Sequence, residues 1–414
     1  MRNQDIVMLC QQGWELAIDC NAKNIARELA RQNRVLYVNM PLDINTVLRN
    51  RNHPEVRSKI QVLRGLAPGL VQAEPNLWVY TPDVLCLSIN WLGSRRVFKL
   101  LNMLNSRLLA GSIRRATQAV GFASYYLFLD GIIFQGLELP RLLRPRCFIY
   151  YLRDYMLTVP YFRRHGPWAE AQLLRQADVV VANSVYLNDY AHQHNPQHSH
   201  YIGQGCVLAR YQAHRPYPVP ADVAAVPQPI IGYTGLLTTL RLDMNLLLAL
   251  ARRRPAWSLV LVGPEDEHFQ QSPLHSLPNV YFLGRKAPEE LPAYLSHFDV
   301  CINPQAVNEV TVGNYPLKID EYLAMGKPVV ATHTRTMELF QDHVRLARSE
   351  DEWIALLETA LTGHDDARSQ AGIAFAQSHT WTASVEHLYD ALDQVGCETE
   401  FLPHRPTNAL FTSD

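Results

Sequence analysis

The chain has 414 residues, of which 48% are hydrophobic and 19% charged, and its formal net charge is −1. This length is too great for one ordinary core and suits two domains of about 200 residues each. The composition excludes a disordered protein, and seven scattered cysteines without C-x-x-C spacing argue against a disulfide framework. We therefore expect a globular protein of a reducing cytoplasm, with its cysteines acting as small core hydrophobes.

Charge is distributed unevenly along the chain. Residues 1–200 carry 23 Lys and Arg against 14 Asp and Glu, whereas residues 201–414 carry 15 against 25. A basic half commonly serves an anionic partner, although a solvated surface produces the same count. No nucleic-acid recognition motif is present, so we expect no nucleic-acid partner. The first ten residues lead straight into an apolar run, which predicts that no signal peptide is present.

In the first half, short apolar runs alternate with segments of helical period. The predicted strands are Ile6–Cys10, Val35–Asn39, Leu77–Tyr80, Ser124–Leu129, Cys147–Leu152 and Val179–Ala182. The predicted helices are Asn21–Gln32, Trp91–Gln118 and Ala169–Gln176, while Arg49–Pro75 stays ambiguous. Such alternation is typical of a doubly wound parallel sheet. We assign residues 1–212 to this first domain.

Five prolines between Arg215 and Pro229 mark a change of composition, and we predict a stiff linker over residues 213–229. The alternation then resumes, which predicts a second Rossmann-like domain over residues 230–380. Its expected strands are Ile230–Thr234, Ser258–Val262, Val280–Leu283, Val300–Asn303 and Val329–Ala331. The groove between the two sheets is the expected active site.

The end of the chain is expected to be helical. Trp381–Val395 has helical period. We expect residues 381–396 to form a helix that either crosses back to the first domain or caps the second sheet. Residues 397–414 contain two prolines and little periodicity, which indicates a tail.

Residues 303–332 carry the strongest functional signal. They predict a strand, a polar loop, a short helix that begins at Pro316 and ends at Gly326, and another strand. A helix that begins at the carboxyl end of a parallel strand points its free N–H groups into the crevice where α/β proteins bind phosphates. Lys318 adds a positive charge in the first turn, and Glu321 can accept hydrogen bonds from sugar or ribose hydroxyls. This pattern predicts a site for a nucleotide-linked sugar.

The stretch P-L-K-x-x-E-Y-L-A-x-G-K-P-V-V-A-T resembles the donor-binding segment of bacterial family 4 (group 1) glycosyltransferases of the GT-B fold. The resemblance is strong over residues 230–332 and weaker at Tyr150–Asp154 and Ala177–Ser184. It implies two Rossmann-like doubly wound parallel-sheet domains that face a central cleft. It also implies that Glu321 holds the ribose of the donor. Eight residues earlier, where this family has a glutamate that contacts the transferred sugar, the chain has Gly313.

Further donor contacts follow from the same resemblance. The GYTG turn that ends at Gly235 is expected to face the diphosphate, and Arg241 is either a bidentate phosphate contact or a contact of the helix that begins at Asp243. Arg285 is expected near the nucleotide base. The predicted donor-binding residues are Glu321, Lys318, Pro316, Asn314, Gly235, Arg241 and Arg285.

Catalytic residues are harder to assign. Asp154 and Asp130 lie at strand ends of the first domain, where either could orient an acceptor or simply cap a helix. Gly13 follows the first strand and either lets the backbone approach an acceptor or phosphate, or forms an ordinary turn. No D-x-D sequence occurs, and we predict that neither a metal nor another cofactor is needed.

Arg95–Gln118 places six basic residues among apolar ones, which fits either a helix on an anionic bilayer or a helix packed on a sheet. We therefore predict a cytoplasmic glycosyltransferase, with possible placement at the inner membrane face, that moves a sugar from a nucleotide donor to a glycan or lipid-linked acceptor. The resemblance implies a setting in bacterial surface polysaccharide synthesis. The alternatives are a sugar-nucleotide 2-epimerase of the same fold and a catalytically silent nucleotide-sugar-binding protein.

Overall fold

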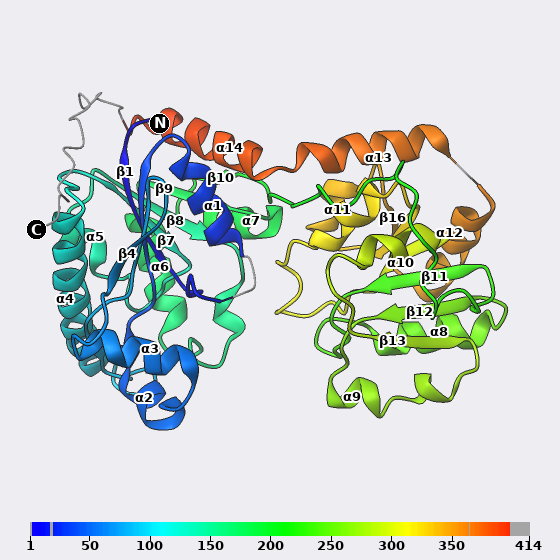
Figure 1. The fold of residues 1–414 in the computed structure, drawn as a ribbon, viewed down its shortest axis with the longest axis horizontal. Helices are drawn as coiled ribbons and strands as arrows, with labels where there is room; N and C mark the ends of the chain where they lie inside the picture. The colour runs from blue at the N-terminus through cyan, green and yellow to red at the C-terminus, as the bar shows by residue number, and fades with distance from the viewer. Residues whose placement is uncertain (1, 17–19, 364, 398–414) are drawn as a thin grey trace, which may run out of the picture.

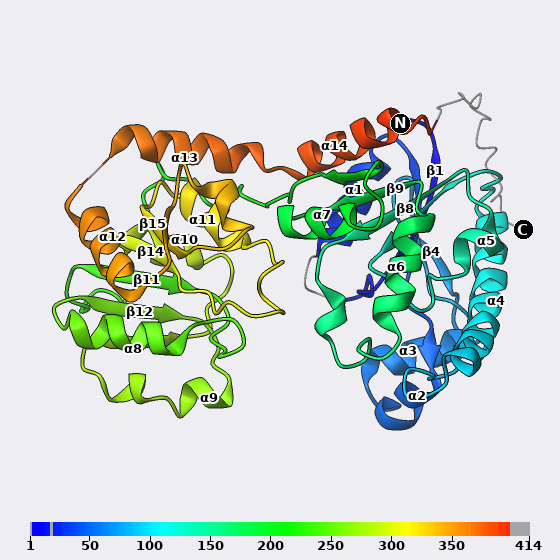
Figure 2. The same ribbon diagram turned by 180° about the vertical axis from the view of Figure 1, so that it is seen from behind.

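The computed structural model describes residues 2–16, 20–363 and 365–397. In the described part the chain forms two lobes that lie side by side, each built on a sheet with helices on both faces (Figure 1). Seen from behind, the same two lobes are joined along one edge, where helices α13 and α14 run almost end to end (Figure 2). The predicted tail lies outside the described residues from position 398 onward.

The first lobe contains an eight-stranded sheet of order β10-β9-β8-β7-β1-β2-β5-β4, in which only β4 is antiparallel to its neighbour. The strands are β1 (Asp5–Cys10), β2 (Arg34–Val38), β4 (Leu70–Glu74), β5 (Leu77–Tyr80), β7 (Tyr126–Asp130), β8 (Cys147–Leu152), β9 (Val179–Ala182) and β10 (Ser199–Tyr201), with a separate pair β3 (Leu42–Asp43) and β6 (Leu85–Cys86). Central strands such as β1 are buried along their whole length, as expected where helices cover both faces.

The helices of this lobe are α1 (Asn21–Ala30), α2 (Ile44–Asn50), α3 (Pro54–Leu63), α4 (Arg95–Ala119), α5 (Leu139–Leu143), α6 (Gly166–Gln176) and α7 (Val185–His192), with a 3-10 turn at Met156–Thr158. The segment that the sequence left ambiguous forms α2, α3 and β4. The predicted helix Trp91–Gln118 begins only at Arg95, because the Ser94 side chain accepts a hydrogen bond from the Val97 N–H and caps it there.

The second lobe contains a six-stranded parallel sheet of order β13-β12-β11-β14-β15-β16. Its strands are β11 (Ile230–Thr234), β12 (Ser258–Val262), β13 (Val280–Gly284), β14 (Val300–Asn303), β15 (Val329–Thr332) and β16 (Arg345–Ala347). Its helices are α8 (Met244–Arg253), α9 (Glu267–Gln270), α10 (Leu291–His297), α11 (Leu317–Ala324), α12 (Glu350–Thr362) and α13 (Asp366–Ser378), with 3-10 turns at Pro273–Ser276 and Met337–Phe340.

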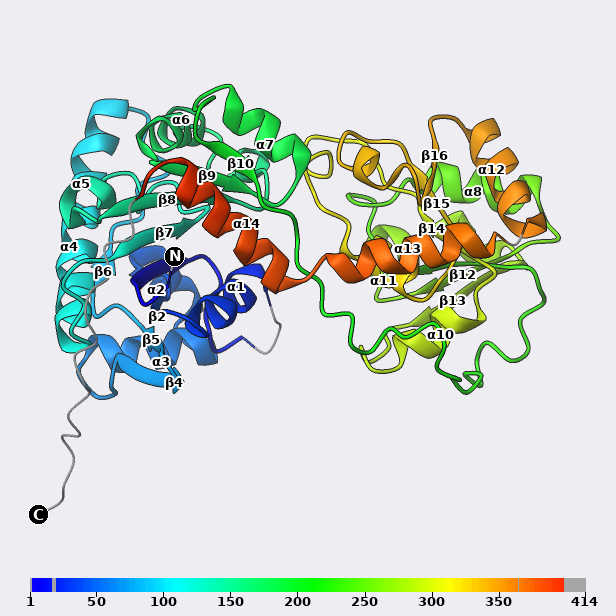
Figure 3. The same cartoon turned by 90° about the horizontal axis from the view of Figure 1, so that it is seen from above.

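The last helix, α14 (Trp381–Gln394), lies on the first lobe (Figure 3). Its buried residues Val385 and Leu388 join the same apolar cluster as Ile25 of α1, and the Tyr389 hydroxyl accepts a hydrogen bond of 3.0 Å from the Asn33 amide. The chain thus crosses between the lobes twice, and α14 fastens its end to the lobe in which the chain began.

The proline-rich segment 213–229 does not lie between the lobes, so its prediction as the linker was wrong. Tyr211 and Val223 are buried in the apolar cluster of the second lobe, whereas Ile202 is buried in the first. The crossing therefore falls between Ile202 and Tyr211. The proline-rich segment is irregular, and its apolar side chains pack against the second lobe. Composition alone does not distinguish such a segment from a free connector.

Candidate functional site

The second sheet has its topological switch point at β11, whose neighbours are β12 on one side and β14 on the other. Ligands of doubly wound sheets bind outside the carboxyl ends of the strands at this point. Two glycines form the turns there. Gly235 follows β11 with φ of +138°, and Gly263 follows β12 with φ of +155°; a Cβ on Gly263 would lie 1.8 Å from the carbonyl oxygen of Gly235. Only glycine fits at position 263, because the two turns pack directly against each other.

Lys318 lies over this edge. It belongs to the first turn of α11, which Pro316 precedes, as the sequence predicted. Its Nζ donates a 2.5 Å hydrogen bond to the Tyr233 hydroxyl and lies 4.2 Å from the centre of that ring. A Cβ on Gly235 would be 3.1 Å from the same Nζ. The half-buried ammonium, the glycine turn and the amino end of α11 thus converge, and all three favour an anion.

Glu321 lies one turn further along α11 and is half-buried. Burial raises the pKa of its carboxyl group, while a hydrogen bond from the Tyr211 hydroxyl and the nearby positive charge of Lys318 oppose that rise. Tyr211 uses one acceptor position of the carboxylate. The remaining lone pairs can accept hydroxyl groups of a ligand held beside Lys318.

The loop before α11 touches the first lobe. The carbonyl oxygen of Gly313 accepts a hydrogen bond of 2.8 Å from the Ser184 hydroxyl at the start of α7. A Cβ on Gly313 would lie only 2.9 Å from the Tyr186 ring, so a glutamate at this position would collide with α7. This contact between the lobes explains why a glycine stands here. Asn314 follows it, half-buried beside Tyr315.

The two predicted arginines lie on exposed surface. Arg241 is in the turn before α8, and it is the Asp243 side chain that caps α8, by accepting the Leu246 N–H. Arg285 follows β13 and is exposed, while its neighbour Lys286 forms a 2.7 Å ion pair with Asp222. Neither arginine is held toward Lys318 by a hydrogen bond or ion pair in the described part of the chain.

The two candidate catalytic carboxylates of the first lobe have different environments. Asp130 is fully buried at the end of β7, and its Oδ1 lies 3.0 Å from Arg153 Nε. Burial raises its pKa, against the attraction of Arg153. A carboxylate without solvent access cannot meet a substrate, so Asp130 positions Arg153. Asp154 is half-exposed, with an oxygen 3.8 Å from the same guanidinium, and it remains the accessible candidate.

Sequence reasoning missed several residues of this region. Tyr233 and Tyr211 hold Lys318 and Glu321, and Asp320, next to Glu321, is completely buried. The tyrosine of the GYTG turn was a usable signal, because it lies near the end of β11, and β11 pairs with β14, the strand that precedes α11. Asp320 gave no such signal, since two of its partners, Cys206 and His379, lie far away along the chain.

The chain has two joined Rossmann-like lobes, and a helix with a lysine in its first turn begins at the switch point of the second. This arrangement is that of the GT-B class. Residues 228–362 match the family described as glycosyl transferases group 1. The putative teichuronic acid biosynthesis glycosyltransferase TuaH of Bacillus subtilis (strain 168) is 29% identical over 172 residues. The match covers 40% of this chain and 43% of that relative, which is less than half of either. The match to this family lies within the second lobe.

Solved structures agree on the fold over nearly the whole chain. Sucrose-phosphate synthase from Thermosynechococcus elongatus superposes with a TM-score of 0.62 at 16% identity, covering 95% of this chain and 99% of that one. Anabaena HepE in complex with UDP-glucose gives 0.59 at 17%, covering 94% and 100%. Trehalose 6-phosphate synthase from Burkholderia multivorans gives 0.65 at 12%, covering 96% and 99%. The GT-B fold predicted from the sequence is confirmed.

Proposed function

We propose that this protein is a glycosyltransferase that moves a sugar from a nucleotide-sugar donor to a glycan or lipid-linked acceptor in surface polysaccharide synthesis. The observation that carries the proposal is the convergence of Lys318, the Gly235 turn and the amino end of α11 beside Glu321. The first three suit a diphosphate, and the carboxylate suits the hydroxyls of a ribose. The likeness to a teichuronic acid glycosyltransferase supports the polysaccharide setting.

The chemistry follows from the charge that a donor releases. When the glycosidic bond to the diphosphate breaks, negative charge grows on the leaving phosphate. Lys318 and the N–H groups at the start of α11 would stabilise it. Asp154 is the accessible carboxylate that would orient the acceptor hydroxyl, while the buried Asp130 would hold Arg153 in place. No step in this scheme requires a metal, and metal independence stays a prediction.

The test is a thermal-shift screen of nucleotides and nucleotide sugars, begun with UDP and UDP-glucose, because a ligand that binds only the folded protein raises the melting temperature. A positive donor is then incubated with and without glycan acceptors. Transfer to an acceptor supports the proposal. Isomerisation of the donor alone would identify a 2-epimerase, and binding without turnover with any acceptor would identify a silent binding protein.

We also propose that the protein acts at the inner face of the membrane, through α4. Its outer surface exposes Val97, Leu100, Leu104 and Leu108, with Leu100 71% exposed. The helix contains six basic and no acidic residues, and the neighbouring Trp91 is 65% exposed. Apolar side chains among cations suit the interface of an anionic bilayer. In the described residues, no helix has the length and apolar character needed to cross a membrane.

Liposome flotation tests this contact. The protein should float with vesicles that contain anionic lipid and not with neutral ones, and high salt should weaken binding. Arg96→Glu with Arg107→Glu should abolish it. Arg252→Glu, on the exposed surface of α8 in the second lobe, is the matched control. Equal flotation of the double variant and the wild type would refute the role of α4.

A further inference from the structure

The first lobe contains a cavity of about 570 Å³, and all the residues that line it belong to that lobe. It lies at the switch point of the first sheet, where β1 has β2 on one side and β7 on the other. Gln11 follows β1, Met40 follows β2, and Ile132 follows β7, and all three line the cavity. A cavity at the carboxyl ends of these strands stands where doubly wound sheets take ligands.

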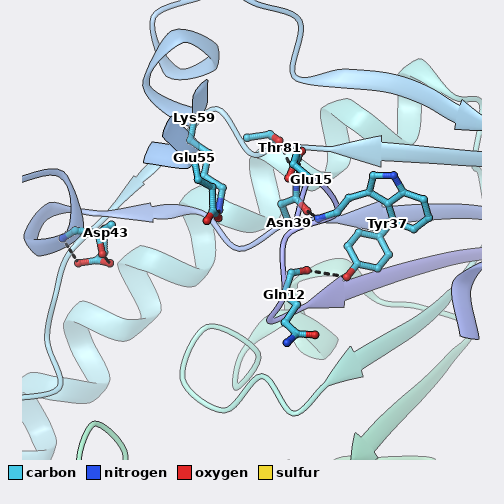
Figure 4. Close-up of polar contacts among 10 residues, drawn as sticks. Gln12, Glu15, Tyr37, Asn39, Asp43, Glu55, Lys59 and Thr81 are labelled. Carbon is cyan, nitrogen blue, oxygen red and sulfur yellow. Dashed lines mark hydrogen bonds and ion pairs between the residues drawn. The ribbon is translucent and has the colours of Figure 1, made fainter. Parts of the chain in front are cut away.

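The polar lining of the cavity contains more carboxylates than lysines or arginines, and it also includes His53. Asp43, Glu55 and Lys59 line it, and Lys59 Nζ lies 2.8 Å from Glu55 Oε1 (Figure 4). Burial alone would raise the pKa of Asp43, but hydrogen bonds from Ser88 and Thr46 outweigh that effect and lower the pKa. Asp43 is therefore ionised at neutral pH. With two carboxylates and one lysine, this polar lining accepts hydrogen bonds and disfavours anions.

A second set of lining side chains is apolar. Its side chains come from the segments after β2 and β7 and from the turn before α6, and they are Met40, Pro41, Ile132, Ile133, Met156 and Phe162. An occupant that satisfies both sets of side chains carries hydroxyl groups together with an apolar portion. A sugar joined to an apolar aglycone has this character.

The loop that forms the edge of the cavity is held in place. Asn39 donates a 3.0 Å hydrogen bond to Glu15 and accepts one of 2.9 Å from the Trp14 N–H, and the Tyr37 hydroxyl donates to the Gln12 carbonyl at 2.7 Å (Figure 4). Gly13 lies between two carboxylates, since a Cβ there would be 3.2 Å from Glu15 and 3.3 Å from Glu55. The negative charge of Glu15 thus stands beside that of Glu55.

We propose that this cavity is the acceptor subsite, and that it takes an uncharged sugar on an apolar aglycone and rejects sugars bearing a carboxylate or phosphate. Its identity as an acceptor subsite rests on the proposed transferase function, whereas its preference for neutral glycosides does not. The carboxylates of Asp43 and Glu55 accept hydrogen bonds from the hydroxyl groups of a neutral sugar, and both repel an anionic one. The neighbouring Arg49, Arg51 and Arg57 are not among the lining residues, and α4 carries six of the basic residues of positions 1–200.

Calorimetric titration of the full chain with p-nitrophenyl glycosides tests the preference without any donor. The β-glucoside, β-galactoside and N-acetyl-β-glucosaminide are the neutral probes, and the β-glucuronide is the anionic one. At least one neutral probe should bind about tenfold more tightly than the glucuronide, because like charges at close range are strongly unfavourable. Glu55→Gln should reduce that ratio to about twofold. Failure of all three neutral probes to bind, or glucuronide binding that equals theirs, overturns the proposal.

Glu138→Gln is the matched control, because Glu138 pairs with Arg141 on α5 outside the cavity. It should leave the ratio unchanged, and an equal effect of both variants would refute the assignment to Glu55. UDP affinity is measured in parallel on the same proteins. Absent UDP binding together with a retained glycoside preference would refute the proposed transferase and leave this cavity as a neutral glycoside site.

Discussion

Asp320 Oδ1 lies 2.6 Å from Nδ1 of His379, and this pair joins α11 to the place where the chain returns to the first lobe. The same buried carboxyl group accepts from the Tyr315 hydroxyl at 2.8 Å and from Cys206 Sγ at 3.2 Å. Cys206 belongs to the first crossing between the lobes, and His379 immediately precedes the second. One residue beside Glu321 therefore connects both crossings to α11.

Asp320→Ala should destabilise the protein by about 3 kcal/mol, because Tyr315, Cys206 and His379 would lose a buried acceptor together. Urea unfolding monitored by tryptophan fluorescence measures the change. Asp320→Asn, which keeps one acceptor oxygen, should recover part of the loss. The control is Asp390→Asn on the exposed face of α14, for which we expect no change. An unchanged unfolding midpoint in Asp320→Ala would contradict the role of this contact.

Lys318→Met should weaken UDP binding by about 10- to 100-fold, since a charge-assisted contact to phosphate contributes about 1.5–3 kcal/mol. Tyr233→Phe should weaken it less, because it removes the hydroxyl that holds the ammonium and leaves the ring beneath it. Titration calorimetry gives both constants. Lys286→Met, which removes a surface cation paired with Asp222, serves as the comparison. If it weakens UDP binding as much as Lys318→Met does, the assignment of Lys318 is wrong.

Comparing Gly263→Ala with Gly284→Ala separates the cost of a steric clash from the cost of backbone strain at positive φ. Both glycines have positive φ, but a Cβ at Gly263 would meet the Gly235 carbonyl, whereas one at Gly284 has nothing within 4 Å. We expect Gly284→Ala to cost about 1 kcal/mol, the penalty of a left-handed alanine. Gly263→Ala should cost several times more and also weaken UDP binding, since the Gly235 turn would move. Equal melting temperatures for the two variants would contradict this geometry.

Helix-end residues and apolar runs in the sequence predicted the bounds of α11 and the central strands. Pro316 and Gly326 set the bounds of α11, and continuous apolar runs set the central strands of both sheets. The first lobe's β4, its short helices α2 and α3, and the crossing near Cys206 were missed, because short segments and irregular connections have weak periodicity. In the candidate site, too, local features were predicted and long-range contacts were not.

Lys318 was predicted from its place in the first turn of a helix, and the structure places it at the switch point. Two of the partners of Asp320 were not predictable, since Cys206 is 114 residues away and His379 is 59 away. The packing of Gly313 on Tyr186 equally depends on how the lobes meet. Contacts of this kind follow from tertiary structure and not from any local pattern.

Glu170 gives the protein a pH dependence that can be measured. Its carboxyl group is buried in α6 and accepts hydrogen bonds of 3.1 Å from both the Tyr150 and the Tyr190 hydroxyls. Burial raises its pKa to about 7, although the two tyrosines oppose the rise. Because the folded state holds this proton more tightly than the unfolded chain, stability is fully present below the unfolded pKa of about 4.5 and falls as pH rises toward 7.

The loss should reach about 3 kcal/mol and should level off above pH 8, where the group is ionised in both states. Urea unfolding at intervals between pH 4.5 and 8.5 measures the slope. Glu170→Gln keeps a hydrogen-bonding partner for each tyrosine and cannot ionise, so its stability should lack this component and exceed that of the wild type at pH 8. The stability curves of the two proteins differ with pH only if folded Glu170 retains its proton. Parallel curves would therefore contradict the raised pKa of Glu170.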